Sequence, residues 1–188
     1  MLVYDRLIHL QVRDIDNMNA LNAKPSSKSL STLDFSGDPI SGSSGVAGGG
    51  LGSIAGPLGL AIDSSGDVWV ANNDGVSKFS QQGVPMTSAA YTSGGITNPV
   101  AVAVDGAGQM WAANSNGTVS VLSNTGTAVS PSTGYSGTGS KPAGIAIDIT
   151  GSVWIPSSTG NKVTKILGAT APVVTLASGS ATELGVRP

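Results

Sequence analysis

Short segments along the chain alternate strictly between large and small apolar residues, and these segments recur at regular intervals. The alternation runs through residues 58–62, 100–104 and 143–147. Successive side chains of a β-strand point to opposite faces, so a period of two predicts a strand in each of these segments. One face of each strand carries only Gly or Ala, so we expect a neighbouring sheet to approach closely on that side.

Each alternating segment opens a unit that occurs three times in full. The prolines, aspartates and tryptophans of the units are separated by 42 and then by 43 residues. Three independent landmarks with one spacing indicate an internal repeat. Residues 30–45 align with residues 76–91, so a partial unit precedes the full ones. The landmarks are Pro57, Pro99 and Pro142; Asp63, Asp105 and Asp148; and Trp69, Trp111 and Trp154.

The order of strands and turns is the same in every unit. The alternating segment ends at the aspartate and a glycine turn, a second strand carries the tryptophan, and an Asn/Ser/Gly loop leads to a third strand. Another glycine turn precedes a weaker fourth strand. Four short strands in about 40–45 residues match one β-propeller blade. We therefore predict an all-β fold, a partial propeller of about three and a half blades with four antiparallel strands in each.

The repeat also predicts how the chain is divided. Residues 1–11 are compatible with a strand or a short helix, and residues 17–23 resemble a degraded second strand with its loop. The predicted segments are an N-terminal segment 1–27, a half-blade 28–47 containing third and fourth strands, full blades 48–92, 93–136 and 137–176, and a C-terminal tail 177–188.

The number of predicted blades is smaller than a closed ring requires. Closed propellers contain at least about four blades. An open stack leaves apolar blade faces exposed, and such faces favour self-association. We expect the chain to be the C-terminal part of a longer bacterial protein; the alternative is that two chains close one ring.

Composition narrows the possible partners. Only 11% of the residues are charged and the net charge is −2, so the chain has no basic stripe for nucleic acid. No apolar run reaches the roughly 20 residues of a membrane span. Charged residues interrupt the first ten positions, which excludes a signal-peptide core there. Cysteine is absent, which excludes disulfides and thiolate chemistry.

Three aspartates repeat in register, as the ligands of a metal ion could. Each ends a strand directly before a glycine turn, where aspartate accepts hydrogen bonds from backbone N–H groups. We therefore interpret Asp63, Asp105 and Asp148 as turn residues, and the tryptophans as packing residues rather than a ligand-stacking set. His9, the single histidine, lies outside the repeat, and residues 14–17 lack the glycine and glutamate of a calcium loop. We expect no catalytic residue, metal site or cofactor.

The loops between the second and third strands form the candidate ligand-binding surface. They are rich in Asn, Ser and Asp, and in an antiparallel blade they lie on the same rim as the connector into the next blade. Such loops often carry binding sites because the scaffold beneath them is fixed. The alternative is that they are hydrophilic turns that contact only water. The candidate residues are Asn72, Asn73, Asp74, Asn114 and Asn116.

Residues 57–72 and 142–154 share the motif Pro-x-Gly-(Leu or Ile)-Ala-Ile-Asp-x-x-Gly-x-Val-Trp. This motif resembles NHL-repeat propellers and the streptogramin-lyase-like (virginiamycin B lyase-like) propellers of bacteria, over about residues 30–188. The resemblance implies a propeller fold and an extracellular or cell-surface location. It also implies, for streptogramin lyases, a histidine and acidic residues with magnesium and, for gluconolactonase-like propellers, Glu, Asn and Asp around a metal. The blades of this chain contain neither histidine nor glutamate.

Two function classes follow from these observations. We expect a non-enzymatic recognition or scaffold module that binds protein or carbohydrate through the loop rim. The alternative is a metal-dependent lyase or lactonase of the streptogramin-lyase type. The absence of histidine and glutamate from the blades favours the binding module, because acid–base catalysis would then depend on aspartate alone.

Overall fold

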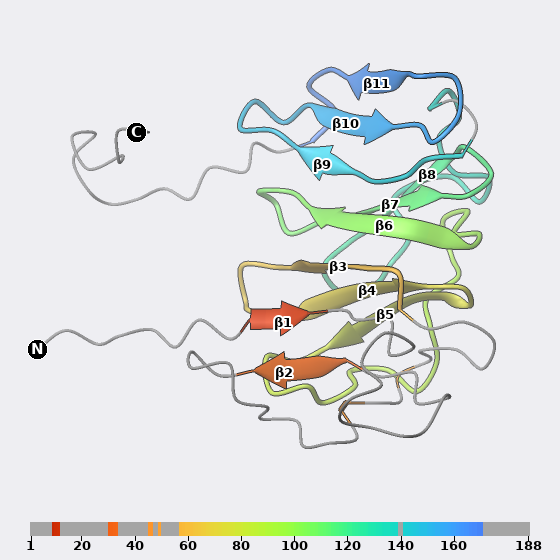
Figure 1. The fold of residues 1–188 in the computed structure, drawn as a ribbon. Helices are drawn as coiled ribbons and strands as arrows, with labels where there is room; N and C mark the ends of the chain where they lie inside the picture. Colours follow the sequence, from red (N-terminus) through yellow and green to blue (C-terminus); the bar gives the residue numbers. More distant parts are fainter. Residues whose placement is uncertain are drawn as a thin grey trace, which may run out of the picture.

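All regular structure in the described part of the chain consists of β-strands. Four antiparallel sheets lie one above another in Figure 1, so the prediction of an all-β fold is confirmed. The structure, a computed structural model, describes residues 57–138 and 141–170, the strand backbone of residues 9–11 and 31–33, and the single positions 30, 45, 46 and 49.

The three larger sheets share one topology. The first contains β3 (Gly59–Ile62), β4 (Val68–Asn72) and β5 (Gly75–Phe79); the second contains β6 (Pro99–Val104), β7 (Met110–Asn114) and β8 (Val119–Leu122); the third contains β9 (Ala146–Ile147), β10 (Val153–Pro156) and β11 (Val163–Ile166). In each sheet the second strand is central and pairs antiparallel with both neighbours. The tryptophan of each unit therefore lies on a central strand.

Tight turns close the first hairpin of each sheet. In the first sheet, the N–H of Gly66 donates to the carbonyl of Asp63 at 2.9 Å, and the N–H of Asp63 donates to the carbonyl of Asp67 at 2.9 Å. Gly66 has a φ of 82°, a left-handed conformation that glycine adopts without steric cost. Gly108 and Gly151 repeat the turn with φ values of 78° and 76°, so the predicted turns are confirmed.

The outer edges of the first and second sheets differ from the predicted four-stranded blade. Beyond the third strand the chain returns only as isolated bridges, such as the pairing of Phe79 with Pro85. Proline has no N–H to donate to a strand ladder. In the second sheet, the N–H of Val121 donates at 2.8 Å to the hydroxyl of Ser130, although a regular ladder would supply a backbone carbonyl. The first and second sheets therefore have three strands and an irregular outer segment.

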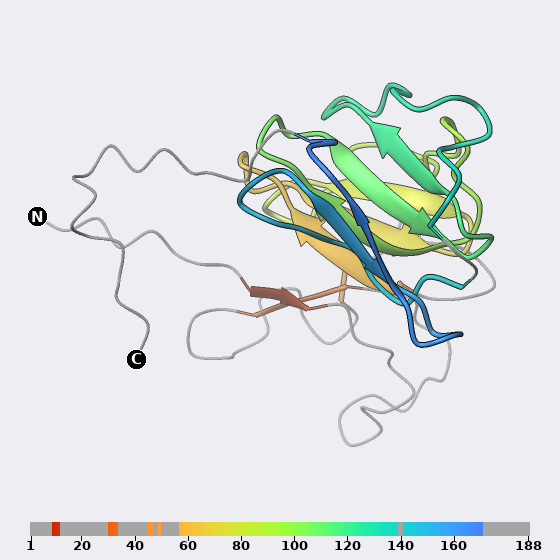
Figure 2. The ribbon, with the colours of Figure 1, turned by 90° about the horizontal axis from the view of Figure 1, so that it is seen from above.

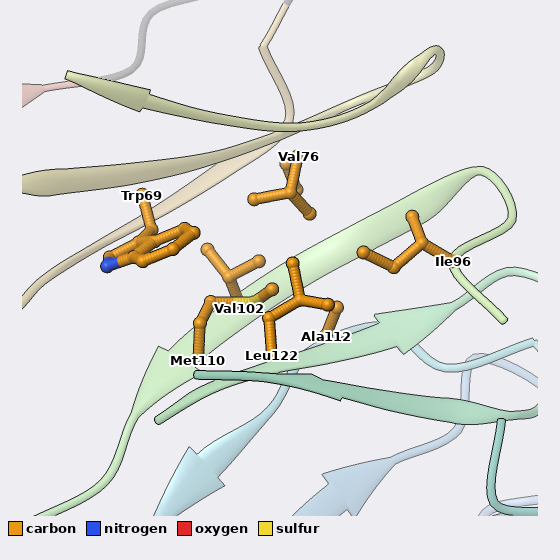
Figure 3. Close-up of a cluster of buried hydrophobic side chains, with 8 residues drawn as sticks. Trp69, Val76, Ile96, Val102, Met110, Ala112 and Leu122 are labelled. Atoms are coloured by element: carbon orange, nitrogen blue, oxygen red, sulfur yellow. The ribbon is translucent and has the colours of Figure 1, made fainter. Parts of the chain in front are cut away.

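A hydrophobic core fills the space between the first and second sheets. Trp69 and Val76 of the first sheet face Val102, Met110 and Leu122 of the second (Figure 3). All five side chains are buried. Apolar surface removed from water contributes about 25 cal/mol per Å², so this interface stabilises the stack.

The second core repeats this arrangement one sheet further along the stack. Trp111 of the second sheet packs with Val153 and Ile155 of the third, and the sheets overlap when they are viewed from above (Figure 2).

A side-chain carbon at Gly59 would lie 3.2 Å from the Cα of Ala101, so the backbones of β3 and β6 approach closely there. This confirms the close approach that the small residues predicted. The first and the second sheet each present their tryptophan face to the next sheet.

The N-terminal part of the chain covers the other face of the first sheet. β1 (His9–Gln11) pairs antiparallel with β2 (Ser31–Leu33), so the strand alternative holds at these N-terminal residues. Leu30 forms an antiparallel bridge with Val46 and is fully buried against the first sheet. The degraded second strand predicted at residues 17–23 lies outside the described residues.

Candidate functional site

Each repeat aspartate holds both its turn and the tryptophan of the following strand. Oδ1 of Asp63 accepts hydrogen bonds from the N–H groups of Ser65 and Asp67 at 2.9 and 3.0 Å. Oδ2 of Asp63 accepts a hydrogen bond from the indole N–H of Trp69 at 3.2 Å. The interpretation of these aspartates as turn residues is confirmed. The pattern recurs in Asp105 with Trp111 at 3.1 Å and in Asp148 with Trp154 at 2.8 Å.

Lys78 completes this arrangement in the first sheet. Its ammonium lies 4.8 Å from the ring centre of Trp69 and forms ion pairs with Asp63 and Asp67 at 3.2 and 3.1 Å. It also donates a hydrogen bond to the carbonyl of Asn124 in the second sheet at 2.9 Å. The Lys78 side chain is only 7% exposed, so its charge is compensated almost entirely by protein groups. Lys78 therefore links the first two sheets.

The position of Lys78 varies along the repeat. Lys165 occupies it in the third sheet, 4.5 Å from the ring centre of Trp154 and 3.9 Å from the carboxylate of Asp148. Val121 occupies it in the second sheet, opposite Trp111. Sequence reasoning missed both lysines. The available signal was the repeat alignment, which places a lysine directly across the hairpin from a tryptophan in two units of three.

Hydrogen bonds hold the pKa of Asp148 well below its ordinary range. The largest contribution comes from the hydroxyl of Thr150, which donates to Oδ1 at 2.6 Å, followed by the indole of Trp154 and the N–H of Ser152. Donors of this kind stabilise the charged form of a carboxylate. Asp148 therefore suits the role of a structural anion better than that of a general acid.

Two of the candidate ligand-binding asparagines lie beneath the loop surface. Asn72 and Asn114 are both fully buried. The amide of Asn72 donates to the hydroxyl of Ser77 at 3.0 Å, and its Oδ1 accepts from the N–H of Asp74 at 2.9 Å. Oδ1 of Asn114 accepts from the N–H of Thr97 at 3.1 Å. The Asn114 amide group donates to the carbonyl of Gly95 and to the hydroxyls of Thr118 and Ser120.

The other three candidate residues reach the surface. Asp74 and Asn116 are exposed, and Asn73 is half-buried. Oδ1 of Asn116 accepts hydrogen bonds from the N–H and the hydroxyl of Thr118 at 3.1 and 2.8 Å, so its orientation in the loop is fixed. Ligand binding by this rim stays a prediction, and its accessible part consists of Asn73, Asp74 and Asn116.

The hairpin loops and the connectors between sheets share one face, as the sequence predicts. The hydroxyl of Thr138, in the connector to the third sheet, donates to the carbonyl of Gly117 in the second hairpin loop at 2.6 Å. Asn98 and Lys141, the last connector residues, have left-handed φ values of 43° and 56°. The carbonyl of Asn98 accepts the N–H of Ser115 at 3.1 Å. We call this surface of hairpin loops and connectors the loop face.

Comparison with solved structures identifies the stack of sheets. A gluconolactonase from Xanthomonas campestris superposes with a TM-score of 0.54 at 18% identity, over 74% of this chain and 44% of that protein. A streptogramin B lyase superposes with a TM-score of 0.53 at 18% identity, over 77% of this chain and 49% of that protein. Both are β-propellers. This chain has a β-propeller fold.

The similarity to these proteins concerns the propeller fold, which the family resemblance in the sequence predicted. The chain spans about half the length of these two propellers, 44% and 49%. The extracellular domain of a one component system from B. thetaiotaomicron also superposes, with a TM-score of 0.52 at 18% identity, over 75% of this chain and 21% of that one. No protein-family model matches the chain, and no curated protein sequence matches it. The three larger sheets are the first, second and third blades.

The chemistry available on the loop face of the propeller is hydrogen bonding. The loops expose amide, hydroxyl and carboxylate groups, and the connectors add the exposed residue Lys141. Among the described residues, no three His, Cys, Asp or Glu side chains gather closely enough to hold a metal ion. Nor does the described part of the propeller include a helix of the length and apolarity that a membrane span requires.

Proposed function

We propose that the chain is a propeller repeat module that acts in binding or scaffolding, within a larger bacterial protein. Its ligand is a protein or a carbohydrate, which contacts the loop face. The ligand-contacting residues are Asn73, Asp74 and Asn116. Asn72 and Asn114 act one layer below, where their buried amides fix the loops that present those three.

One observation carries this proposal. Three polar side chains that are exposed or half-buried, those of Asn73, Asp74 and Asn116, lie on the loop face above a scaffold of buried strands. The repeat aspartates, by contrast, use both carboxylate oxygens within the blade. A fixed scaffold with polar loops of variable sequence is the usual arrangement of a recognition surface.

The proposed location is outside the cell or at its surface. The structural likeness includes the extracellular domain of a one component system from B. thetaiotaomicron, which supports an extracellular setting for a propeller of this kind. A rim of amides, hydroxyls and one carboxylate is suited to sugar hydroxyls or to peptide backbone. Each hydrogen bond to a neutral partner contributes roughly 1 kcal/mol, so several loops together are needed for micromolar affinity.

A binding screen with a matched control tests the proposal. The full chain is applied to a polysaccharide array and to a peptide array, and every hit is remeasured with a triple variant, Asn73→Ala, Asp74→Ala and Asn116→Ala. We expect the variant to lose affinity at least tenfold. The control triple Ser64→Ala, Gln82→Ala and Asn124→Ala removes exposed polar side chains at the opposite ends of the strands and keeps full affinity. Equal binding by both triples would rule out the loop face as the site.

The fold supports a second candidate function. A gluconolactonase and a streptogramin B lyase share the propeller fold with this chain, so a metal-dependent lactonase or lyase is the alternative. The chain has one histidine, His9, and one glutamate, Glu183. A turnover assay with lactones and cyclic depsipeptides in the presence of magnesium decides between the two. Turnover that disappears with EDTA would favour the enzyme, and its absence with retained ligand binding would favour the binding module.

A further inference from the structure

The charged side chains of the three blades divide into two groups. In the first group, the charge of each side chain is compensated inside its own blade, by an ion pair or by hydrogen-bond donors of the turn and the tryptophan. This group consists of Asp63, Asp67 and Lys78 in the first blade, Asp105 in the second, and Asp148 and Lys165 in the third.

The second group consists of the remaining charged residues at positions 57–138 and 141–170, and all of its members lie on the loop face. Asp74 belongs to the hairpin loop of the first blade, Lys162 to that of the third, and Lys141 to the connector before the third blade. All three residues are exposed. The loop face therefore carries negative charge over the first blade and positive charge over the third.

The two lysines flank one hairpin loop. The N–H of Ser158 donates to the carbonyl of Lys141 at 2.9 Å, and the N–H of the preceding residue, Ser157, donates to the carbonyl of Lys162 at 2.9 Å. The hydroxyl of Ser158 adds a second hydrogen bond to the Lys141 carbonyl at 3.0 Å. Neither ammonium forms an ion pair with a described residue. The backbones are thus anchored to the loop, and both charges can meet an anionic group above it.

The part of the loop face next to the lysines is polar but uncharged. From residue 79 to residue 140 the sequence has a single charged residue, Asp105, which is buried. The hairpin loop of the second blade exposes Ser115 and Asn116, and the connector that follows exposes Ser136. Hydroxyl and amide groups both donate and accept hydrogen bonds, as the hydroxyls of a sugar do.

The hairpin loops lack the side chains that usually anchor a protein partner. They comprise residues 73–74, 115–118 and 157–162, and none of the exposed large apolar side chains of the described residues lies in them. Protein interfaces depend mostly on a few buried aromatic or other large side chains that fill pockets. Of the two proposed ligand classes, the loops therefore favour carbohydrate over protein.

We infer that the ligand of the loop face is an acidic polysaccharide. A carboxylate of the polymer lies between Lys141 and Lys162, and sugar hydroxyls meet the uncharged loop around Asn116. Asp74 repels carboxylates at the other end of the loop face, so the charges of the loops orient the polymer. This inference rests on the proposed function and adds the chemical class of its ligand.

Matched polysaccharides test the inference. The full chain is titrated with hyaluronan, alginate and pectate, and with the same three polymers after their carboxylates have been reduced to primary alcohols. We expect at least one acidic polymer to bind at least about fivefold more tightly than its reduced form, because two lysines contact the carboxylate. This preference should disappear in about 1 M salt, which screens exposed charges.

Variants that borrow residues from the second blade locate the preference. Asn98 and Thr118 are the second-blade equivalents of Lys141 and Lys162, and Asn98 shares the left-handed conformation of Lys141, with φ values of 43° and 56°. The double variant Lys141→Asn with Lys162→Thr should bind the acidic and the reduced polymer equally well.

A control with the same change of charge uses a lysine outside the loop face. Lys162→Thr and Lys165→Val each remove one positive charge, and Lys165→Val introduces the residue that the second blade has at that position, Val121. We expect Lys162→Thr to weaken the preference for the acidic polymer and Lys165→Val to leave it unchanged.

The outcomes separate this inference from the proposed function. The inference is overturned if no acidic polymer is preferred to its reduced form, if the double variant keeps the preference, or if polyglutamate binds and no polysaccharide does. The proposed function survives each of these results as long as the triple variant at Asn73, Asp74 and Asn116 weakens the binding of some ligand. A ligand that the triple variant and the double variant bind as tightly as the natural chain does would overturn both.

Discussion

The first and third blades contain the same three side chains in the same local arrangement but in different surroundings. Asp63, Trp69 and Lys78 are buried between two blades, whereas Trp154 of the third blade is 37% exposed. The indole hydrogen bonds and the positions of the ammonium over the ring are nevertheless alike, at 3.2 and 2.8 Å and at 4.8 and 4.5 Å. The repeat sequence alone therefore sets the local geometry, and the neighbouring blade sets the burial.

The largest expected difference between the two blades concerns tryptophan. Trp69→Ala removes a fully buried side chain and leaves a cavity between two blades, which should lower the free energy of unfolding by about 3–5 kcal/mol. Trp154→Ala should cost less than half as much, because part of the ring already contacts water. Urea unfolding followed by far-ultraviolet circular dichroism measures both. Equal losses would mean that the neighbouring blade contributes little to the stability of this site.

The loss of stability expected for Lys78 is smaller than that for Trp69. Lys78→Val leaves the buried carboxylate of Asp63 facing the unpaired carboxylate of Asp67, which should cost about 3 kcal/mol of unfolding free energy. Lys165→Val breaks a half-exposed pair and should cost less than about 1 kcal/mol. Urea titration of each variant against the natural chain provides the values.

The second blade offers a control for the lysine prediction. It has Val121 in place of Lys78 and, in the turn, Gln109 in place of Asp67. The double variant Lys78→Val with Asp67→Gln reproduces that combination in the first blade and removes one of the two facing carboxylates. We expect the double variant to recover at least half of the stability lost by Lys78→Val. Strictly additive effects would show that the two residues do not interact.

The smallest expected effect is a pH dependence of the thermal stability, which arises from Asp148 of the third blade. The pKa of Asp148 is lower in the folded state than its ordinary value of 3.8. The ionised carboxylate therefore stabilises the fold at pH values above 3.8, and this stabilisation is lost progressively as the pH falls below 3.8. The natural chain should therefore lose thermal stability more steeply below about pH 4 than the variant Asp148→Asn. Melting temperatures recorded between about pH 6 and 2 test this; parallel curves would contradict it.

Sequence patterns predicted the parts of the fold that depend on neighbours along the chain. The alternation around Gly59, the turn at Asp63 and the common rim of loops and connectors all follow from local spacing. The sequence predicted a weaker fourth strand in each blade, but Pro85 in the first blade and the hydroxyl of Ser130 in the second interrupt the ladder. An outer segment has one pairing partner only, so a single residue can change it.

The features that sequence reasoning missed depend on contacts between distant residues. Asn114 looks like an exposed loop residue, yet it is buried because the connector residues Gly95 and Thr97 fold over it. The left-handed conformation of Lys141 gives no signal in the sequence, since lysine rarely adopts it. Such positions become visible only when the hairpin loop and the connector are placed side by side.

The isolated bridges at the outer edges of the first and second blades have a consequence for local unfolding. The central strand β4 is bonded on both sides and fully buried, whereas the segment around Pro85 is attached to β5 at single points. Amide hydrogens of the outer segment should therefore exchange through local openings that cost only a small fraction of the global unfolding free energy. Those of β4 should exchange only through openings that cost nearly all of it. The perimeter of the stack is thus where proteases cut first, and where the chain can accept an insertion without loss of its core.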